Sequence, residues 1–190
     1  MRGKNVSIWD VGPMKLLTFF MDNPYGEVYL REAAKKIHLS PFAVKKYADI
    51  LLKESLIVEE RRANLRNFKA NMGSLFFRHL KVARNLDLIT KSNLLGYLVK
   101  HTPNVSSIVL FGSMARGEDD GRSDLDLVVI GAKKQINLSE YEEKVGREIN
   151  VHVFSWADWQ KKAAEDAPFY NEVIASGIPL QGEIPQVRWK

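Results

Sequence analysis

Two aspartates stand two residues apart at the start of an apolar run in the C-terminal half of the chain. Asp124 and Asp126 lead into Leu-Val-Val-Ile at 127–130, a run that predicts a strand. Side chains at positions i and i+2 of a strand share one face. Because two carboxylates on one face repel each other unless a divalent cation joins them, this spacing predicts a site for Mg²⁺ and triphosphate oxygens.

A glycine and a serine follow the preceding apolar run. Residues 107–111 predict a strand buried on both faces, and Gly112 and Ser113 then lead into a short helix. Glycine lets the backbone approach a phosphate closely, the serine offers a hydroxyl, and the free N–H groups of the helix start point to the same place. Arg116 is expected either near the triphosphate or as an exposed helix arginine.

A third polar position lies on a later strand. Residues 146–154 alternate apolar side chains with Glu148, Asn150 and His152, which therefore share the opposite face. An amide oxygen can ligate Mg²⁺, but an amide cannot accept a proton at neutral pH. If Asn150 belongs to the site, it should face the aspartate pair, with Glu148 or His152 as the alternative base about 7 Å along the strand.

Each of these patterns is common alone, and an Asp-x-Asp pair is usually a solvated turn. Their order is more specific: Gly112-Ser113, ten intervening residues, then Asp124 and Asp126. Over about residues 104–154 the chain resembles the nucleotidyltransferases of the DNA polymerase beta superfamily, in particular the minimal nucleotidyltransferases. The resemblance implies a mixed sheet flanked by helices, nucleotide phosphates on the Gly-Ser pair, and Mg²⁺ or Mn²⁺ on the aspartates.

The same resemblance implies a third carboxylate, which helps to bind the metal and activates the attacking hydroxyl. Asn150 stands at that position, so catalysis is less certain than nucleotide binding. The family also implies an NTP substrate, with ATP expected first. Minimal nucleotidyltransferases are often antitoxins that modify a tyrosine of a HEPN ribonuclease, which suggests a HEPN-type partner protein.

The N-terminal half carries a different pattern. Helical spacing predicts three helices and strand-like composition predicts a hairpin, at residues 13–21, 30–37, 41–53, 56–60 and 65–69. Ser40-Pro41 is a strong start signal for the third helix. Residues 13–71 therefore resemble the winged helix-turn-helix family, whose recognition helix enters the major groove of duplex DNA.

The predicted DNA contacts are basic side chains on the third helix and on the hairpin: Lys45, Lys46, Arg61, Arg62 and Arg66. Lysine and arginine contacts to phosphates give affinity without sequence information. The alternative is a module for dimerisation or protein docking, in which Lys45 and Lys46 are only a solvated face. A homodimer is left open.

Charge divides the chain in the same way. Its net charge of +5 combines 18 basic and 9 acidic residues in 1–101 with 10 basic and 14 acidic residues in 102–190. We expect an α+β protein with a winged helix-turn-helix domain at 10–72, a connector of two helices at 73–101, and a nucleotidyltransferase domain at 102–182. The basic half suits a polyanion, and the acidic half suits cations.

Composition narrows the class further. The chain has no cysteine, which excludes disulfides and thiolate zinc sites, and its four histidines lack ligand spacing. No window approaches the roughly 18 apolar residues of a membrane span, so a cytoplasmic protein is expected. Trp156, Trp159, Phe169 and Tyr170 are expected in the core, with stacking on a base as the alternative. The tail from 181 to 190 is expected to fray.

Two functions from different classes fit these patterns. The first is a Mg²⁺-dependent transferase that moves NMP from an NTP to a hydroxyl on protein or nucleic acid, with a DNA-binding winged helix. The second is a DNA-binding transcriptional regulator or antitoxin whose degenerate transferase domain only senses nucleotide. The Gly-Ser and Asp pairs favour the first function, and Asn150 favours the second.

Overall fold

The structure, a computed structural model, describes residues 7–62 and 65–188. It divides into two compact units, Met1–Lys81 and Val82–Lys190. The boundary falls within the long helix α4 (Leu75–Ser92), inside the segment expected to be a connector.

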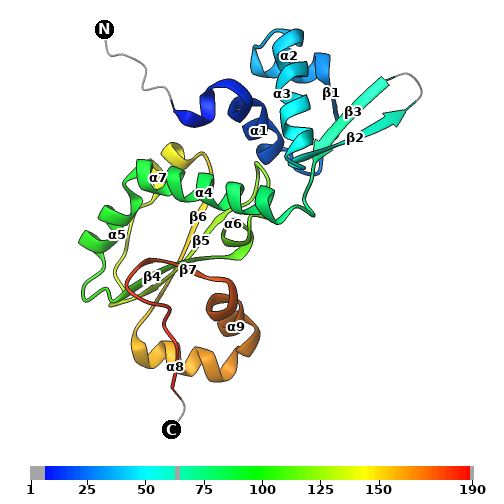
Figure 1. The fold of residues 1–190 in the computed structure, drawn as a ribbon. Helices are drawn as coiled ribbons and strands as arrows, with labels where there is room; N and C mark the ends of the chain where they lie inside the picture. The colour runs from blue at the N-terminus through cyan, green and yellow to red at the C-terminus, as the bar shows by residue number, and fades with distance from the viewer. Residues whose placement is uncertain (1–6, 63–64, 189–190) are drawn as a thin grey trace, which may run out of the picture. The chain divides into compact units, whose positions relative to one another are not determined.

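The first unit combines helices with a small antiparallel sheet of strand order β1-β3-β2 (Figure 1). Its elements are η1 (Ile8–Asp10), α1 (Gly12–Asp22), β1 (Val28–Tyr29), α2 (Leu30–Ile37), α3 (Pro41–Lys53), β2 (Ile57–Arg62), β3 (Leu65–Ala70) and the start of α4. The three helices and the hairpin expected from sequence are all present. The two-residue strand β1, which pairs with β3, was not expected.

Local sequence explains where these helices begin and end. The Ser40 hydroxyl accepts a 3.1 Å hydrogen bond from the N–H of Ala43, and Pro41 occupies the first turn of α3. Helix α2 ends at Ile37, and the next residue, His38, has a left-handed backbone and donates its N–H to the carbonyl of Ala34. The turn between α2 and α3 is therefore held from both sides.

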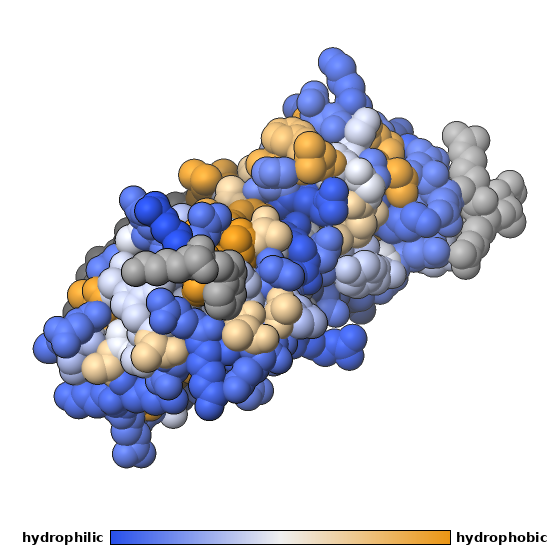
Figure 2. Space-filling model, turned by 90° about the horizontal axis from the view of Figure 1, so that it is seen from below, coloured by the Kyte–Doolittle hydropathy of each residue, from blue (hydrophilic) through white to orange (hydrophobic). Residues whose placement is uncertain are grey.

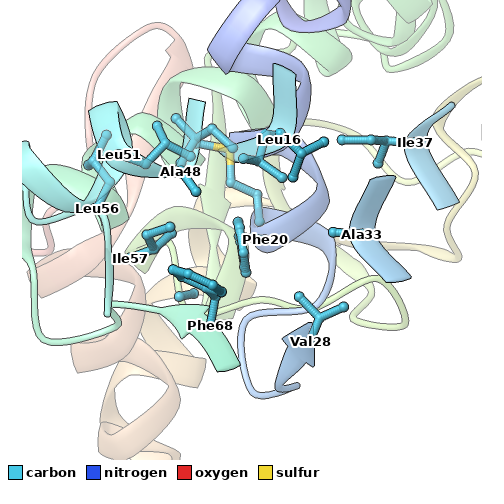
Figure 3. Close-up of a cluster of buried hydrophobic side chains, with 14 of the residues drawn as sticks. Leu16, Phe20, Val28, Ala33, Ile37, Ala48, Leu51, Leu56, Ile57 and Phe68 are labelled. Carbon is cyan, nitrogen blue, oxygen red and sulfur yellow. The ribbon is translucent and has the colours of Figure 1, made fainter. Parts of the chain in front are cut away.

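Apolar side chains from the helices and the hairpin form the core of this unit. Figure 3 shows Phe20 and Phe68 close together, with Leu16 and Ile57 beside them. All four are at most 1% exposed. The hydrophobic stripes of α1 and α3 therefore pack onto one face of the small sheet, which fixes the opposite face of α3 toward solvent.

The second unit is built on a four-stranded mixed sheet of order β6-β5-β4-β7 (Figure 1). In this sheet, all of whose strands lie within the described residues, only the β5–β6 pair is parallel. Its elements after α4 are α5 (Leu94–His101), β4 (Ser107–Phe111), α6 (Gly112–Arg116), β5 (Leu125–Ile130), α7 (Ser139–Val145), β6 (Ile149–Phe154), α8 (Trp156–Glu165), α9 (Ala167–Ser176) and β7 (Ile178–Gln181). The expected mixed sheet flanked by helices is confirmed.

Helices cover both faces of this sheet. One face packs residues such as Leu110 and Leu127 against α5 and α7, and the other packs Val109 and Val128 against α8 and α9. Figure 1 shows α8 and α9 together on one side. Strands β4 and β5 are thus buried on both faces, which explains their almost uninterrupted apolar sequence.

Two expectations about the end of the chain were wrong. Residues 182–188, the described part of the tail, are tied down rather than frayed: the indole N–H of Trp159 donates to the carbonyl of Pro185 at 2.7 Å, and the N–H of Val187 donates to the Tyr170 hydroxyl at 2.8 Å. Trp156, at the start of α8, is 46% exposed, unlike the other three aromatic residues of this region, which pack in the core.

Figure 2 shows a largely hydrophilic face that apolar residues interrupt in separate patches. Within residues 7–62 and 65–188, none of the helices has the length and hydrophobicity needed to cross a membrane.

Candidate functional site

Strand pairing brings the predicted polar residues into one row across the sheet. Asp126 of β5 pairs with Phe111 of β4 on one side and with Asn150 of β6 on the other. Asp124 lies just before β5 and is half-buried, like Asp126 and Asn150. The expectation that Asn150 faces the aspartate pair is confirmed, because its amide nitrogen donates to Asp124 Oδ2 at 3.3 Å and to Asp126 Oδ1 at 3.1 Å.

Gly112 brings the turn between β4 and α6 against the same carboxylates. Its φ of +73° lies in the left-handed region, and a Cβ at this position would come within 2.7 Å of Asp126 Oδ2. Only glycine meets both conditions without displacing Asp126. The backbone of Gly112 therefore lies directly beside Asp126.

This close approach gives a test of the site. We expect Gly112→Ala to weaken binding of ATP with Mn²⁺ more than about tenfold, the factor that ~1.4 kcal/mol produces, because the new Cβ must push Asp126 aside. Gly146→Ala is the matched control: Gly146 has a φ of +72°, and a Cβ there would meet nothing within 4 Å. Both variants carry the left-handed strain, so equal losses of affinity in calorimetry would contradict the clash.

Arg116, the third predicted nucleotide-binding residue, is already engaged by two carboxylates. Its Nε donates to Glu118 at 2.8 Å, and its Nη1 donates to Glu172 of α9 at 2.6 Å. These hydrogen bonds, first to Glu118 and then to Glu172, raise the pKa of Arg116 above its ordinary value. A contact with triphosphate would require Arg116 to exchange at least one carboxylate for a phosphate.

The two alternative bases differ in their surroundings. Glu148 is exposed, and its backbone carbonyl accepts the N–H of Leu125 at 2.9 Å. His152 is also exposed, with its ring 5.9 Å from the ring of Phe111 and 5.6 Å from that of Phe169, centroid to centroid. Asn150, rather than either of them, is the β6 residue that touches the aspartates.

Asp124, Asp126 and Asn150 form a donor set suited to a hard cation. The described residues include no group of three His, Cys, Asp or Glu side chains that could hold a metal, so a cation here would take two carboxylates and one amide. In the present orientation the amide nitrogen donates a hydrogen bond to each carboxylate. Turning the amide by 180° would present its oxygen, and the two orientations have the same shape. The residues therefore fit Mg²⁺ or Mn²⁺.

Sequence reasoning missed a buried polar group beside this site. Arg147 and Asp119 form an ion pair at 3.2 Å, and Asp119 also accepts a 3.0 Å hydrogen bond from Asn85. No local pattern signals this group, because Asn85 and Asp119 are 34 residues apart in the chain. The three side chains hold the loop that precedes Asp124.

The predicted DNA contacts of the first unit have unequal surroundings. Lys45 and Lys46 are exposed on α3. Arg66 instead donates two hydrogen bonds to Glu59, at 2.8 and 2.7 Å, and its guanidinium lies over the ring of Phe68. The backbones of Arg61 and Arg62 belong to β2, but their side chains lie outside the described residues.

The second unit thus combines a mixed sheet, a glycine turn and an aspartate pair in the arrangement of a nucleotidyltransferase domain. Residues 93–183 match the family model described as "Polymerase beta, Nucleotidyltransferase". Over these residues the chain is therefore similar to polymerase beta-type nucleotidyltransferase domains.

Solved structures show weaker likeness. A toxin-antitoxin complex crystallised with AMP-PNP is 18% identical, with a TM-score of 0.37 over 48% of this chain and 72% of that chain. HmgR of Pseudomonas aeruginosa is 15% identical, with a TM-score of 0.32 over 65% of this chain and 48% of that chain. A search of curated proteins found no match.

Proposed function

We propose that the C-terminal unit binds a nucleoside triphosphate together with Mg²⁺ or Mn²⁺ and transfers its NMP group to a hydroxyl. The observation that carries this proposal is the contact of Asn150 with Asp124 and Asp126, directly beside the backbone of Gly112. Carboxylates alone would repel a triphosphate, so a cation between them and the phosphates is required. ATP is the nucleotide that we propose first.

The chemistry assigns a task to each group. The hydroxyl oxygen of the acceptor forms a bond to the α-phosphorus, the bond from that phosphorus to the bridging oxygen breaks, and pyrophosphate leaves. A cation held by Asp124, Asp126 and the Asn150 amide oxygen would supply charge stabilisation for the phosphoryl group. Gly112 and Ser113 would donate backbone N–H groups to phosphate oxygens. The hydroxyl proton must go to solvent or to another base, because an amide cannot accept it.

A second function is favoured by Asn150 itself. Its amide joins the two carboxylates without any cation. A domain with this feature could bind nucleotide and report it to a regulator without turning it over. Incubating the protein with α-³²P-labelled ATP, Mn²⁺ and candidate acceptors separates the two functions: a labelled acceptor supports transfer, whereas nucleotide binding without any labelled product supports sensing.

For the acceptor we propose a tyrosine hydroxyl on a HEPN-type partner protein, following the resemblance to minimal nucleotidyltransferases. A hydroxyl of nucleic acid is the alternative. Mass spectrometry of the partner after incubation with ATP would show the mass of one added AMP group in the first case and none in the second.

For the N-terminal unit we propose a winged helix that binds duplex DNA through α3. Lys45 and Lys46 are exposed on that helix, and Phe42 near its start is 80% exposed. On the hairpin of β2 and β3, Arg66 is paired with Glu59 and Lys69 with Glu60, so these two cations are less available to phosphate than the lysines of α3. The alternative remains a docking module for a protein partner.

The unequal surroundings of the basic residues predict unequal effects on DNA binding. Lys45→Ala combined with Lys46→Ala should weaken binding of mixed-sequence duplex and reduce the salt slope by about 1 for each phosphate that is no longer neutralised. Arg66→Ala should change the affinity much less, because the guanidinium of Arg66 is already hydrogen-bonded to the Glu59 carboxylate. Fluorescence anisotropy over a range of about 50 to 200 mM salt measures both affinities. An equal loss of DNA affinity in the two variants would mean that Arg66 exchanges its contact with Glu59 for one with a DNA phosphate.

A further inference from the structure

Three buried polar side chains hold the loop between α6 and β5. Asp119 of this loop is 1% exposed, Asn85 of α4 is 3% exposed, and the side chain of Arg147 is 7% exposed. Burying charged groups is unfavourable unless they are paired and hydrogen-bonded. The ion pair of Arg147 with Asp119 meets that condition, and its burial indicates that both residues have fixed positions.

Arg147 also holds the backbone of the loop immediately before Asp124. Its Nη1 donates to the carbonyl of Asp120 and, at 2.8 Å, to the carbonyl of Ser123. On the other side of Asp124, the N–H of Leu125 donates to the carbonyl of Glu148, the neighbour of Arg147. The residues on either side of Asp124 are therefore hydrogen-bonded to two adjacent residues, Arg147 and Glu148.

Asn85 connects this arrangement to the phosphate-binding turn. Its amide nitrogen donates to Asp119 Oδ1 at 3.0 Å and to the carbonyl of Met114 at 3.1 Å. Met114 belongs to α6, the helix that begins at Gly112. One network thus touches both parts of the proposed site, the glycine turn and the aspartate loop.

We propose that Arg147 is a positioning residue for the cation site: it fixes Asp124 at the separation from Asp126 and Asn150 that a divalent cation requires. This inference rests on the proposed nucleotide function. The planar guanidinium suits the task, because it donates to three oxygens in fixed directions, whereas a lysine ammonium is a compact charge on a flexible stem. Residues that orient metal ligands typically contribute about 10- to 100-fold in metal affinity.

The test uses the full-length protein with ATP and MnCl₂ as probes. Arg147→Lys keeps the charge but not the three directed hydrogen bonds. Arg122→Lys is the matched control, because Arg122 lies in the same loop with its side chain 93% exposed. Calorimetry at fixed ATP gives the Mn²⁺ concentration for half-maximal nucleotide binding, and the Tm in EDTA gives fold stability without cation.

We expect Arg147→Lys to raise the half-saturating Mn²⁺ concentration at least about tenfold at a temperature well below its Tm. Arg122→Lys should match the wild type. A purely structural ion pair would lower the Tm without moving Mn²⁺ half-saturation, and that result would overturn the positioning role. If Arg147→Lys does not fold, Asn85→Ala replaces it: a shift in the same direction supports the role, and wild-type half-saturation overturns it.

The wild-type protein separates this inference from the function on which it rests. Absence of ATP binding by the wild type in the presence of Mn²⁺ would overturn the proposed function and the positioning role together. Binding by the wild type with an unchanged Mn²⁺ requirement in the variant would overturn the positioning role alone.

Discussion

Asn150→Asp should raise the rate of NMP transfer by about 10²- to 10⁴-fold, the usual contribution of a general base. The side chain already touches Asp124 and Asp126, so the new carboxylate would enter the site without rearrangement of β6. It could accept the proton of the attacking hydroxyl, which the amide cannot do. Nucleotide affinity at saturating Mn²⁺ should change little, because both aspartates and Gly112 remain.

The same substitution has a second expected effect that does not depend on finding the acceptor. It replaces an N–H donor by a third carboxylate beside two others, so the three charges repel one another. In EDTA we therefore expect a lower Tm for Asn150→Asp than for the wild type, with recovery when Mn²⁺ is added. Differential scanning calorimetry with and without the cation measures this shift.

Two comparisons show whether Asn150 limits the rate. Glu148→Gln and His152→Ala should leave wild-type transfer unchanged, since Asn150 is the β6 side chain that contacts the aspartates. A vigorous wild-type rate that Asn150→Asp does not increase would contradict the prediction. A loss of that rate in one of the two comparison variants would then identify the base.

Periodicity together with the family resemblance made the central part of the site predictable from sequence. Alternation along 146–154 assigned Asn150 to a polar face, and the parallel pairing of β5 with β6 brought that face to Asp126. The positive φ of Gly112 shows that this position needs glycine, and its role at a phosphate stays a prediction. Alternation along a strand is a local property that a single sequence contains, whereas the contact of Asn150 with Asp126, 24 residues away, was expected only through the family resemblance.

Contacts between distant segments were not predictable in the same way. Arg147 reads as an ordinary charge before a strand, and only the fold brings it to Asp119, 28 residues earlier. The tail looked mobile because the groups that hold it, the Trp159 indole and the Tyr170 hydroxyl, lie in other helices. Similarly, the sequence presented Arg66 as a free cation, whereas its cross-strand neighbour Glu59 occupies it.

Asp126→Asn should abolish cation-dependent nucleotide binding and therefore transfer. The carboxylate contacts Asn150 and lies beside the Gly112 backbone, so its loss leaves Asp124 as the single carboxylate that contacts Asn150 among the described residues. We expect the affinity for ATP with Mn²⁺ to fall by more than about 100-fold, since outer-shell partners alone contribute roughly 10- to 100-fold. The amide keeps the shape of the side chain and removes like-charge repulsion with Asp124, so the Tm in EDTA should be no lower than that of the wild type.

The matched control is Asp158→Asn, which changes an exposed carboxylate on α8 and should bind ATP normally. Calorimetry in Mn²⁺ and in EDTA tests this prediction. The assignment of a cation to this site would be wrong if the wild type bound ATP equally well in both conditions, or if a folded Asp126→Asn variant still bound ATP.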